Sequence, residues 1–222
     1  MSEPRPHERV NDILLGPLER PALQWLAEHM PRWVTPDVLT SIGVVGALMT
    51  FAGYWASSSA AAFLWLASFG LAVNWFGDSL DGSLARFREI ERPKFGFFID
   101  HTVDAISETL IVLGLGLSPY VSFQVAAVAL IGYLLMSVLV YVRTYVTGEF
   151  RISYGRFGPT EVRVIVILFN TVLFFVGERI VSLWFGEVSI YDLAIGALGA
   201  ALIIVFLVST TLEARQLARV GE

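Results

Sequence analysis

Cysteine is absent from this 222-residue sequence, and charged residues are scarce. Without cysteine the protein has no disulfides, no thiolate metal ligands and no cysteine nucleophile. Charged residues make up 16% of the sequence and apolar residues 55%, whereas soluble domains average about 25% charged. The net charge of −5 and the lack of long runs of like charge argue against a nucleic-acid partner. The composition therefore predicts a polytopic membrane protein.

Six apolar stretches follow residue 36, and each is close to the roughly 20 residues that a membrane-spanning helix needs. We therefore expect an all-α integral membrane protein with six transmembrane helices. No repeat or second core is evident, so the chain divides into an N-terminal cytosolic or interfacial segment, residues 1–36, and a six-helix domain, residues 37–222. The stretches run approximately from Val38 to Ala56, Ala60 to Gly77, Phe97 to Pro119, Ser122 to Val146, Pro159 to Gly177 and Ile190 to Leu212.

The N-terminal segment contains one candidate helix, from Pro21 to Met30. Ala22, Trp25, Leu26 and Met30 fall on one side of it, which is an amphipathic pattern suited to a membrane surface. A helix packed as a cytosolic collar against the transmembrane core is an equally good interpretation.

Basic residues predict the orientation of the spans, because connections rich in Lys and Arg stay in the cytosol. All of the 15 Lys and Arg residues except Arg179 fall on one side of the predicted topology. Both termini and the connection between the second and third spans are therefore expected to face the cytosol.

Four aspartates lie where the sequence otherwise resembles membrane, on either side of that second connection. Asp78, Asp81 and Ala85 are spaced at i, i+3 and i+7, so they share one stripe of a helix. Asp100 and Asp104 share a stripe of the next helix. A carboxylate at bilayer depth costs at least about 2 to 3 kcal/mol, so such residues indicate a partner or a function.

If the two helices are antiparallel, these stripes face each other and bring together four negative charges. Two divalent cations would balance them. Carboxylate ligands favour hard ions such as Mg²⁺ or Mn²⁺. Gly82 and Ala85 leave space beside the acids for a flat ligand such as a nucleotide.

The motif Asp78-x2-Asp81-Gly82-x2-Ala85-Arg86-x9-Gly96-x3-Asp100-x3-Asp104 resembles the signature of the CDP-alcohol phosphotransferase family, also called the CDP-alcohol phosphatidyltransferase family (class I). Its members are integral membrane enzymes of phospholipid synthesis. The connection has nine residues here, whereas the family more often has eight. Because the extra residue leaves both stripes intact, it affects the loop rather than the acids.

The resemblance implies a transferase that moves a substituted phosphate from a CDP-alcohol donor to an alcohol or lipid acceptor, releasing CMP. Residues 37–222 would then be the catalytic domain, with two Mg²⁺ or Mn²⁺ ions, and the protein would form a homodimer. The implied metal ligands are Asp78, Asp81, Asp100 and Asp104, of which Asp104 would also take the proton of the acceptor hydroxyl. The implied nucleotide-binding residues are Asp78, Asp81, Gly82, Ala85 and Arg86.

His101 directly follows the third aspartate. Choline and ethanolamine phosphotransferases often have a similar Asp-His pair, which favours a CDP-aminoalcohol donor, a diacylglycerol acceptor and a catalytic role for His101. A histidine that only packs at the interface is the alternative. Whether the lipid or the headgroup carries the CDP stays open.

A second polar cluster, Gly158 to Arg163, lies at the start of the fifth span. Pro159 and Glu161 suit the first turn of a helix, which makes a capped helix start one interpretation. In the other, Arg163 with Arg143 or Arg151 forms an anion or acceptor-headgroup site beside the metals.

One polar residue and one short segment near the spans are not assigned to the site. Asn74, one turn before Asp78, is expected to form hydrogen bonds within the helix bundle, and orienting a ligand carboxylate is the alternative. The segment Thr35 to Thr40 is similar to a Pro-Asn-x-x-Thr element of the family, but Asp37 replaces the asparagine, so no site role is carried over.

A divalent-cation transporter or sensor is the alternative from another functional class, because inward-facing acids also mark ion pathways. Such a protein has no evident need for small residues at 82 and 85, whereas a nucleotide site does.

Overall fold

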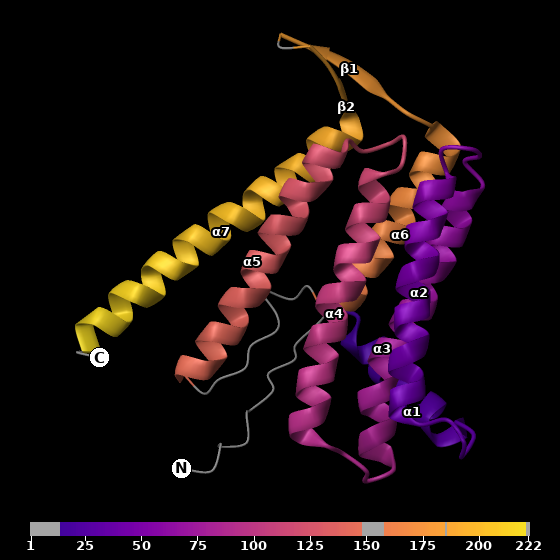
Figure 1. The fold of residues 1–222 in the computed structure, drawn as a ribbon, viewed down its shortest axis with the longest axis vertical. Helices are drawn as coiled ribbons and strands as arrows, with labels where there is room; N and C mark the ends of the chain where they lie inside the picture. The colour runs from indigo at the N-terminus through magenta and orange to yellow at the C-terminus, as the bar shows by residue number, and fades with distance from the viewer. Residues whose placement is uncertain (1–13, 148–157, 185, 221–222) are drawn as a thin grey trace.

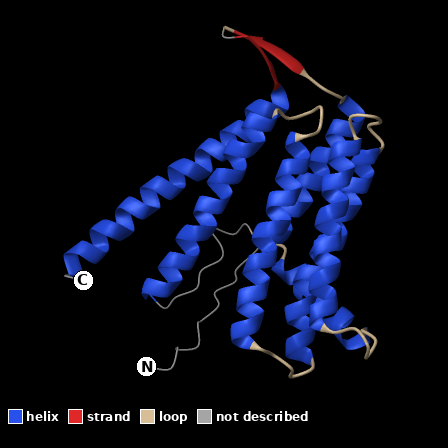
Figure 2. Ribbon diagram, in the orientation of Figure 1, coloured by secondary structure: helices blue, strands red, loops and turns tan. Residues whose placement is uncertain are grey.

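The computed structural model describes residues 14–147, 158–184 and 186–220. Within these ranges the chain forms helices and one short antiparallel hairpin (Figures 1 and 2). The helices are α1 (Gly16–His29), α2 (Pro36–Ala56), α3 (Phe63–Phe87), α4 (Pro93–Gly116), α5 (Phe123–Thr147), α6 (Pro159–Val176) and α7 (Ile190–Val220). The hairpin strands are β1 (Ile180–Leu183) and β2 (Gly186–Ser189).

Three helices that build the interior begin with proline, whose fixed φ suits the first helical turn. Thr35 caps α2, and its Oγ1 accepts a hydrogen bond of 3.3 Å from the Val38 N–H. Pro93 begins α4, and Pro159 begins α6. The predicted start of the fifth span at Pro159 is confirmed.

α2 and α3 make the most extensive helix contact, and glycine makes it possible. A Cβ on Gly46 would lie 2.3 Å from the Asn74 backbone nitrogen, and one on Gly77 would lie 2.3 Å from that of Gly43. Only glycine allows such an approach between the two backbones. The contact fixes the stripe of α3 that carries Asp78 and Asp81 relative to α2.

The other helices cover this pair (Figure 1). α4 packs against α2 and α5, while α6 and α1 pack against α3, and α7 runs along α5. One apolar cluster, including Leu39, Leu80 and Leu84, lies where α1 meets α2 and α3. A second cluster, including Tyr54, Leu115 and Tyr191, joins helices near the hairpin end.

Four helices, α2, α5, α6 and α7, are long and apolar enough to cross a membrane. α3 and α4 have 25 and 24 residues, which at 1.5 Å per residue exceeds a bilayer core of about 30 Å. Both helices carry acidic residues among their apolar ones, so they are not among the four helices that are apolar enough by composition. The prediction of an integral membrane protein is confirmed.

Three details differ from or extend the prediction. α1 begins at Gly16, one turn before the predicted Pro21. α3 continues past the predicted end at Gly77 to Phe87, so Asp78 and Asp81 lie within this helix. The hairpin between α6 and α7 was not predicted, because residues 180–189 are too few and too mixed in polarity to give a clear pattern.

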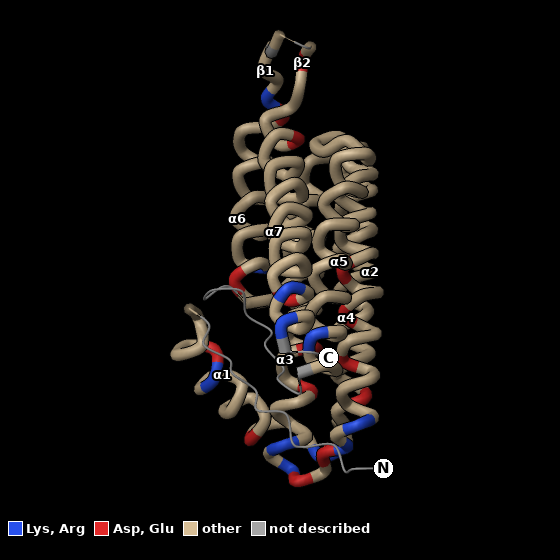
Figure 3. The backbone as a smooth tube through the Cα atoms, turned by 90° about the vertical axis from the view of Figure 1, so that its left-hand side faces the viewer, with Lys and Arg blue, Asp and Glu red and all other residues tan. Residues whose placement is uncertain are grey.

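Charged residues gather toward the end of the bundle that holds α1 and the α3–α4 connection (Figure 3). Arg88 joins these elements. Its guanidinium donates to the carbonyl oxygens of Met30 (3.0 Å), Pro31 (2.9 Å) and Val34 (2.5 Å), at and just after the end of α1. Arg92 forms an ion pair with Asp37, which ties the α3–α4 connection to the start of α2.

Candidate active site

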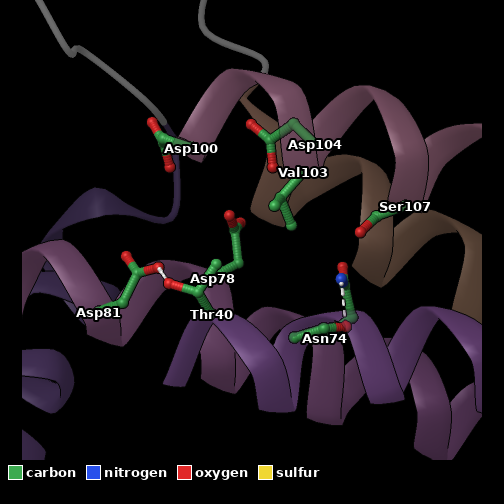
Figure 4. Close-up of a pocket in the computed structure, with 9 residues that line it drawn as sticks. Thr40, Asn74, Asp78, Asp81, Asp100, Val103, Asp104 and Ser107 are labelled. Atoms are coloured by element: carbon green, nitrogen blue, oxygen red, sulfur yellow. Dashed lines mark hydrogen bonds between the residues drawn. The ribbon is translucent and has the colours of Figure 1, made fainter. Parts of the chain in front are cut away.

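The acidic stripes of α3 and α4 face each other across one pocket (Figure 4). Asp78 and Asp81 come from α3, and Asp100 and Asp104 come from α4. The structure thus brings together all four predicted carboxylates. The pocket is also lined by Thr40, Gly43, Asn74, Val103 and Ser107.

Asp81 is oriented by α2. The Thr40 hydroxyl donates to Asp81 Oδ2 at 2.6 Å, and Thr40 lies on the first turns of α2. Thr40 belongs to the element from which no site role was carried over. The structure now gives it one, as a residue that holds a pocket carboxylate.

Asp78 is paired with Arg163 of α6. Arg163 Nη2 donates to Asp78 Oδ2 at 2.8 Å, and the two side chains are 14% and 21% exposed. Arg163 Nε donates to Asn74 Oδ1 at 3.0 Å, while Asn74 Nδ2 donates to the Gly43 carbonyl at 2.9 Å. Asn74 therefore bonds within the bundle, as expected, and also orients the arginine.

The pocket residues fit a divalent cation. Asp100, His101 and Asp104 each offer a ligand atom, and these atoms lie within 4.8 Å of one another. Four carboxylates line this one pocket, and Arg163 forms an ion pair with one of them, Asp78. Oxygen ligands with one imidazole suit hard or borderline divalent ions.

His101 lies at the edge of this acidic pocket. Its Nδ1 is 3.7 Å from Asp100 Oδ2, and its ring contacts the rings of Phe97 and Tyr141, with centroids 4.3 and 5.1 Å away. The side chain is 15% exposed. His101 thus combines aromatic packing with a place among the possible metal ligands.

The small residues lie on the α3 stripe beside the acids. A Cβ on Gly82 would have the Arg86 guanidinium, at 3.4 Å, as its nearest neighbour. Arg86 is exposed, and its Nη2 donates to Ser83 Oγ at 3.3 Å. The space above Gly82 is thus bordered by a flexible cation rather than by packed backbone.

Arg143 and Arg151 are the other arginines predicted for an acceptor site. Arg143 Nε is 3.1 Å from Glu213 Oε1, so this α5 residue forms an ion pair with α7. Arg151 lies outside the described residues. Arg163 is paired with an aspartate of the pocket.

Sequence reasoning missed two polar residues on the same face of α4. Ser107 lines the pocket, is 3% exposed, and its Oγ has no hydrogen-bond partner among the described residues. Glu108 accepts a hydrogen bond from the Tyr133 hydroxyl of α5. The sequence spacing could have predicted Glu108, because it continues the i+4 series of Gly96, Asp100 and Asp104 on one face of the helix.

A model of the family described as CDP-alcohol phosphatidyltransferase matches residues 33–213, which include every pocket residue. The chain belongs to this family. The resemblance based on the aspartate motif is therefore confirmed.

Relatives within the CDP-alcohol phosphatidyltransferase family have different substrates in their names. The chain is 31% identical over 179 residues to cholinephosphotransferase 1 of Gallus gallus, covering 75% of this chain and 51% of that protein. It is 36% identical over 104 residues to archaetidylinositol phosphate synthase of Pyrococcus horikoshii, covering 47% and 52%. The chain thus spans about half the length of these curated relatives.

A solved structure of this family has the same fold. Phosphatidylinositol phosphate synthase of Mycobacterium tuberculosis, crystallised with CDP-DAG, superposes with a TM-score of 0.56 at 23% identity. The match covers 84% of this chain and 88% of that one.

Proposed function

We propose that this protein transfers a substituted phosphate group from a CDP-linked donor to the hydroxyl of an alcohol acceptor and releases CMP. The acceptor oxygen forms a bond to phosphorus, and the bond from that phosphorus to the CMP oxygen breaks. The observation that carries the proposal is the pocket in which Asp78, Asp81, Asp100 and Asp104 face one another.

The four aspartates would hold two Mg²⁺ or Mn²⁺ ions. When bound, such ions stabilise the negative charge that develops on the transferred phosphate and align the attack. Asp104 would accept the proton of the acceptor hydroxyl, and His101 is the second candidate for that role. A proton acceptor must lie within hydrogen-bond reach of the hydroxyl, and both residues border the same cluster.

Residues of α3 and α6 would bind the donor. Gly82 and Ala85 give the cytidine room, with Asp78, Asp81 and Arg86 completing the nucleotide site. Arg163 has an Nη1 that is buried without a hydrogen-bond partner in the described part of the chain. A buried guanidinium nitrogen with a free donor suits a phosphate oxygen.

The lipid substrate would lie against α4 and α5. A groove of about 690 Å³ runs between these helices and shares His101 with the acidic cluster. Its floor extends along α4 from Phe97 to Leu110, about 20 Å at 1.5 Å per residue. A fatty acyl chain in one leaflet of a bilayer with a core of about 30 Å would fit along it. The groove is lined by Phe97, Phe98, His101, Thr102, Ala105, Ile106, Thr109, Leu110, Leu134 and Tyr141.

Filling this groove is expected to slow the reaction with long-chain lipids. The substitution Leu134→Trp narrows the groove from α5 without touching an acidic residue, and we expect kcat/KM for a long-chain diacylglycerol to fall about tenfold, the scale of a pocket misfit of 1 to 3 kcal/mol. A short-chain diacylglycerol should lose less. Leu168→Trp, on the exposed face of α6, is the matched control. Equal losses with both chain lengths would place the lipid elsewhere.

The choice of donor rests on His101 and on the relatives. The Asp100-His101 pair and the likeness to cholinephosphotransferase 1 favour CDP-choline or CDP-ethanolamine with diacylglycerol. CDP-diacylglycerol with a headgroup alcohol is the alternative. Purified protein with Mn²⁺ should be given each donor in turn with its acceptor, diacylglycerol for CDP-choline and CDP-ethanolamine and a panel of headgroup alcohols for CDP-diacylglycerol, while CMP is measured. Release of CMP from none of the three would refute the proposed activity.

The proposed topology has six spans, with α3 and α4 crossing beside the four more apolar helices. Both termini and the acidic pocket would face the cytosol, since the described Lys and Arg residues gather toward one end of the bundle (Figure 3) and all of the 15 Lys and Arg residues except Arg179 fall on one side of the predicted topology. α1 would lie at the membrane surface, with Leu18 and Trp25 exposed to lipid. Labelling of introduced single cysteines from either side of the membrane tests the orientation, because this sequence has no cysteine of its own.

A homodimer is proposed on the family resemblance alone.

A further inference from the structure

The polar residues at the start of α6 point to two different helices. Thr160 and Glu161 contact α1 and the residue before it, whereas Arg163 contacts α3. The same turn of α6 therefore joins the N-terminal helix to the acidic pocket.

Glu19 of α1 forms the first of these contacts. Its Oε1 accepts a hydrogen bond of 2.7 Å from Thr160 Oγ1 and one of 2.8 Å from Trp75 Nε1. Trp75 lies on α3, next to Asn74, which orients Arg163. One carboxylate oxygen thus connects α1, α3 and α6.

Glu161 forms the second contact. Its Oε1 accepts from the Leu15 N–H at 2.7 Å, and its Oε2 accepts from the Gly158 N–H at 2.9 Å. Glu161 is 4% exposed. A buried carboxylate is tolerated where hydrogen bonds satisfy it, and both oxygens of Glu161 are satisfied.

α1 is also held at its other end, where Arg88 of α3 binds the carbonyls of Met30, Pro31 and Val34. A helix fixed to α3 at its C-terminal end and to α6 at its N-terminal end acts as a strap across the two. We use "α1 strap" for the hydrogen bonds of Glu19 and Glu161 described above.

Arg163 depends on this arrangement. Near four carboxylates a guanidinium has several possible partners, yet in the structure it binds Asp78 and Asn74, and its Nη1 has no hydrogen-bond partner among residues 14–147, 158–184 and 186–220. For Arg163 to keep these two partners, the first turn of α6 must keep its position along α3 and its rotation about its own axis. The contacts of Thr160 with Glu19 and of Glu161 with the Leu15 N–H contribute to both.

We propose that Glu19 and Glu161 are positioning residues that hold the start of α6 so that the Arg163 guanidinium stays against Asp78. They touch neither substrate nor metal. The inference rests on the cation site proposed above, because Arg163 and a cation compete for the charge of Asp78.

This competition gives a test that does not depend on turnover. Displacing Arg163 frees Asp78 and removes a positive charge, so Mn²⁺ should bind more tightly. We expect Glu19→Ala to lower the apparent Kd of Mn²⁺ about threefold and Arg163→Ala to lower it about tenfold, a coupling of the size found between charged neighbours. The Kd is measured from the rise of the thermal unfolding midpoint with Mn²⁺ concentration. Adding Glu19→Ala to Arg163→Ala should change nothing further.

Two controls separate positioning from charge and from general loss of stability. Glu19→Gln removes the charge but keeps the oxygen that accepts both hydrogen bonds, so its Mn²⁺ affinity should equal that of the unmodified protein. Glu28→Ala removes a glutamate on the same helix that bonds only Gln24 among the described contacts, and should also be silent. Removing a negative charge by itself cannot tighten Mn²⁺ binding, so a lower Kd in Glu19→Ala would come from the lost hydrogen bonds.

The outcomes are distinct. An unchanged Mn²⁺ affinity in Glu19→Ala, or the same threefold change on the Arg163→Ala background, would overturn the role of the strap while leaving the transferase proposal intact. A protein whose unfolding midpoint does not respond to Mn²⁺ at all would count against the cation site and the strap together.

Discussion

Replacing Asp100 with asparagine is expected to reduce CMP formation about a thousandfold or more. The amide keeps the size of the side chain but removes one anionic ligand from the cluster formed with His101 and Asp104. A bound ion supplies several kcal/mol of charge stabilisation, and a loss of about 4 kcal/mol corresponds to about three orders of magnitude in rate. CMP release under saturating donor measures the effect.

Although Asp100→Asn is expected to lower activity, it should not lower the thermal stability of the metal-free protein. Four carboxylates repel each other when no cation is bound, so Asp100→Asn should raise or leave unchanged the unfolding midpoint in chelator and reduce the gain on adding Mn²⁺. Asp192→Asn is the control, because Asp192 accepts a hydrogen bond from the Ser122 N–H at 2.7 Å, far along the chain from the motif. Activity within tenfold of normal in Asp100→Asn would rule out a ligand role for Asp100.

The substitution Ala85→Leu is expected to abolish CMP production while Mn²⁺ binding stays largely intact. Ala85 shares the α3 stripe with Asp78, Asp81 and Gly82, so a leucine there projects into the space assigned to cytidine. If the cytidine cannot enter its site, the reacting phosphate of the donor is no longer aligned. Misplacement of reacting groups by about 1 Å can lower the rate about a hundredfold. CMP release and Mn²⁺-dependent thermal stabilisation are measured on the same preparation.

This prediction separates the transferase from a cation transporter or sensor. Ala72→Leu makes the same change on an exposed face of α3 and should leave CMP release unchanged. If Ala85→Leu is as active as Ala72→Leu, the space beside Gly82 is not a nucleotide site. Loss of Mn²⁺ binding in Ala85→Leu would instead indicate a general distortion of α3.

The acidic pocket was largely predictable from the sequence, because its main geometry is local. Residues at i+3, i+4 and i+7 share a helix face whatever surrounds it, and a short connection makes neighbouring helices antiparallel. Asp78, Asp81, Asp100 and Asp104 therefore had few alternative arrangements. Gly82 was informative in the same way, because a residue without a side chain on the acidic stripe predicted space for a ligand beside the aspartates.

Contacts between distant helices were not predictable in the same way. Arg163 lies 85 residues after Asp78, and its local polar cluster indicated a possible anion site without showing that Asp78 would be its partner. Arg143, which was named with it, pairs with Glu213. Glu161 was expected to stabilise its own helix start and does so, but its bond to Leu15 depends on where α1 lies. Such pairings are decided by packing over the whole bundle.

The backbone contact between α2 and α3 restricts how substrate preference can change in this scaffold. Gly46 and Gly77 leave no room for even a methyl group, so Thr40 and Asp81 cannot shift apart or together without separating the two helices. The wall of the acidic pocket formed by α2 and α3 therefore has a fixed shape. If the protein is the proposed transferase, adaptation to a larger or smaller alcohol would occur along α4, which faces that wall across the pocket.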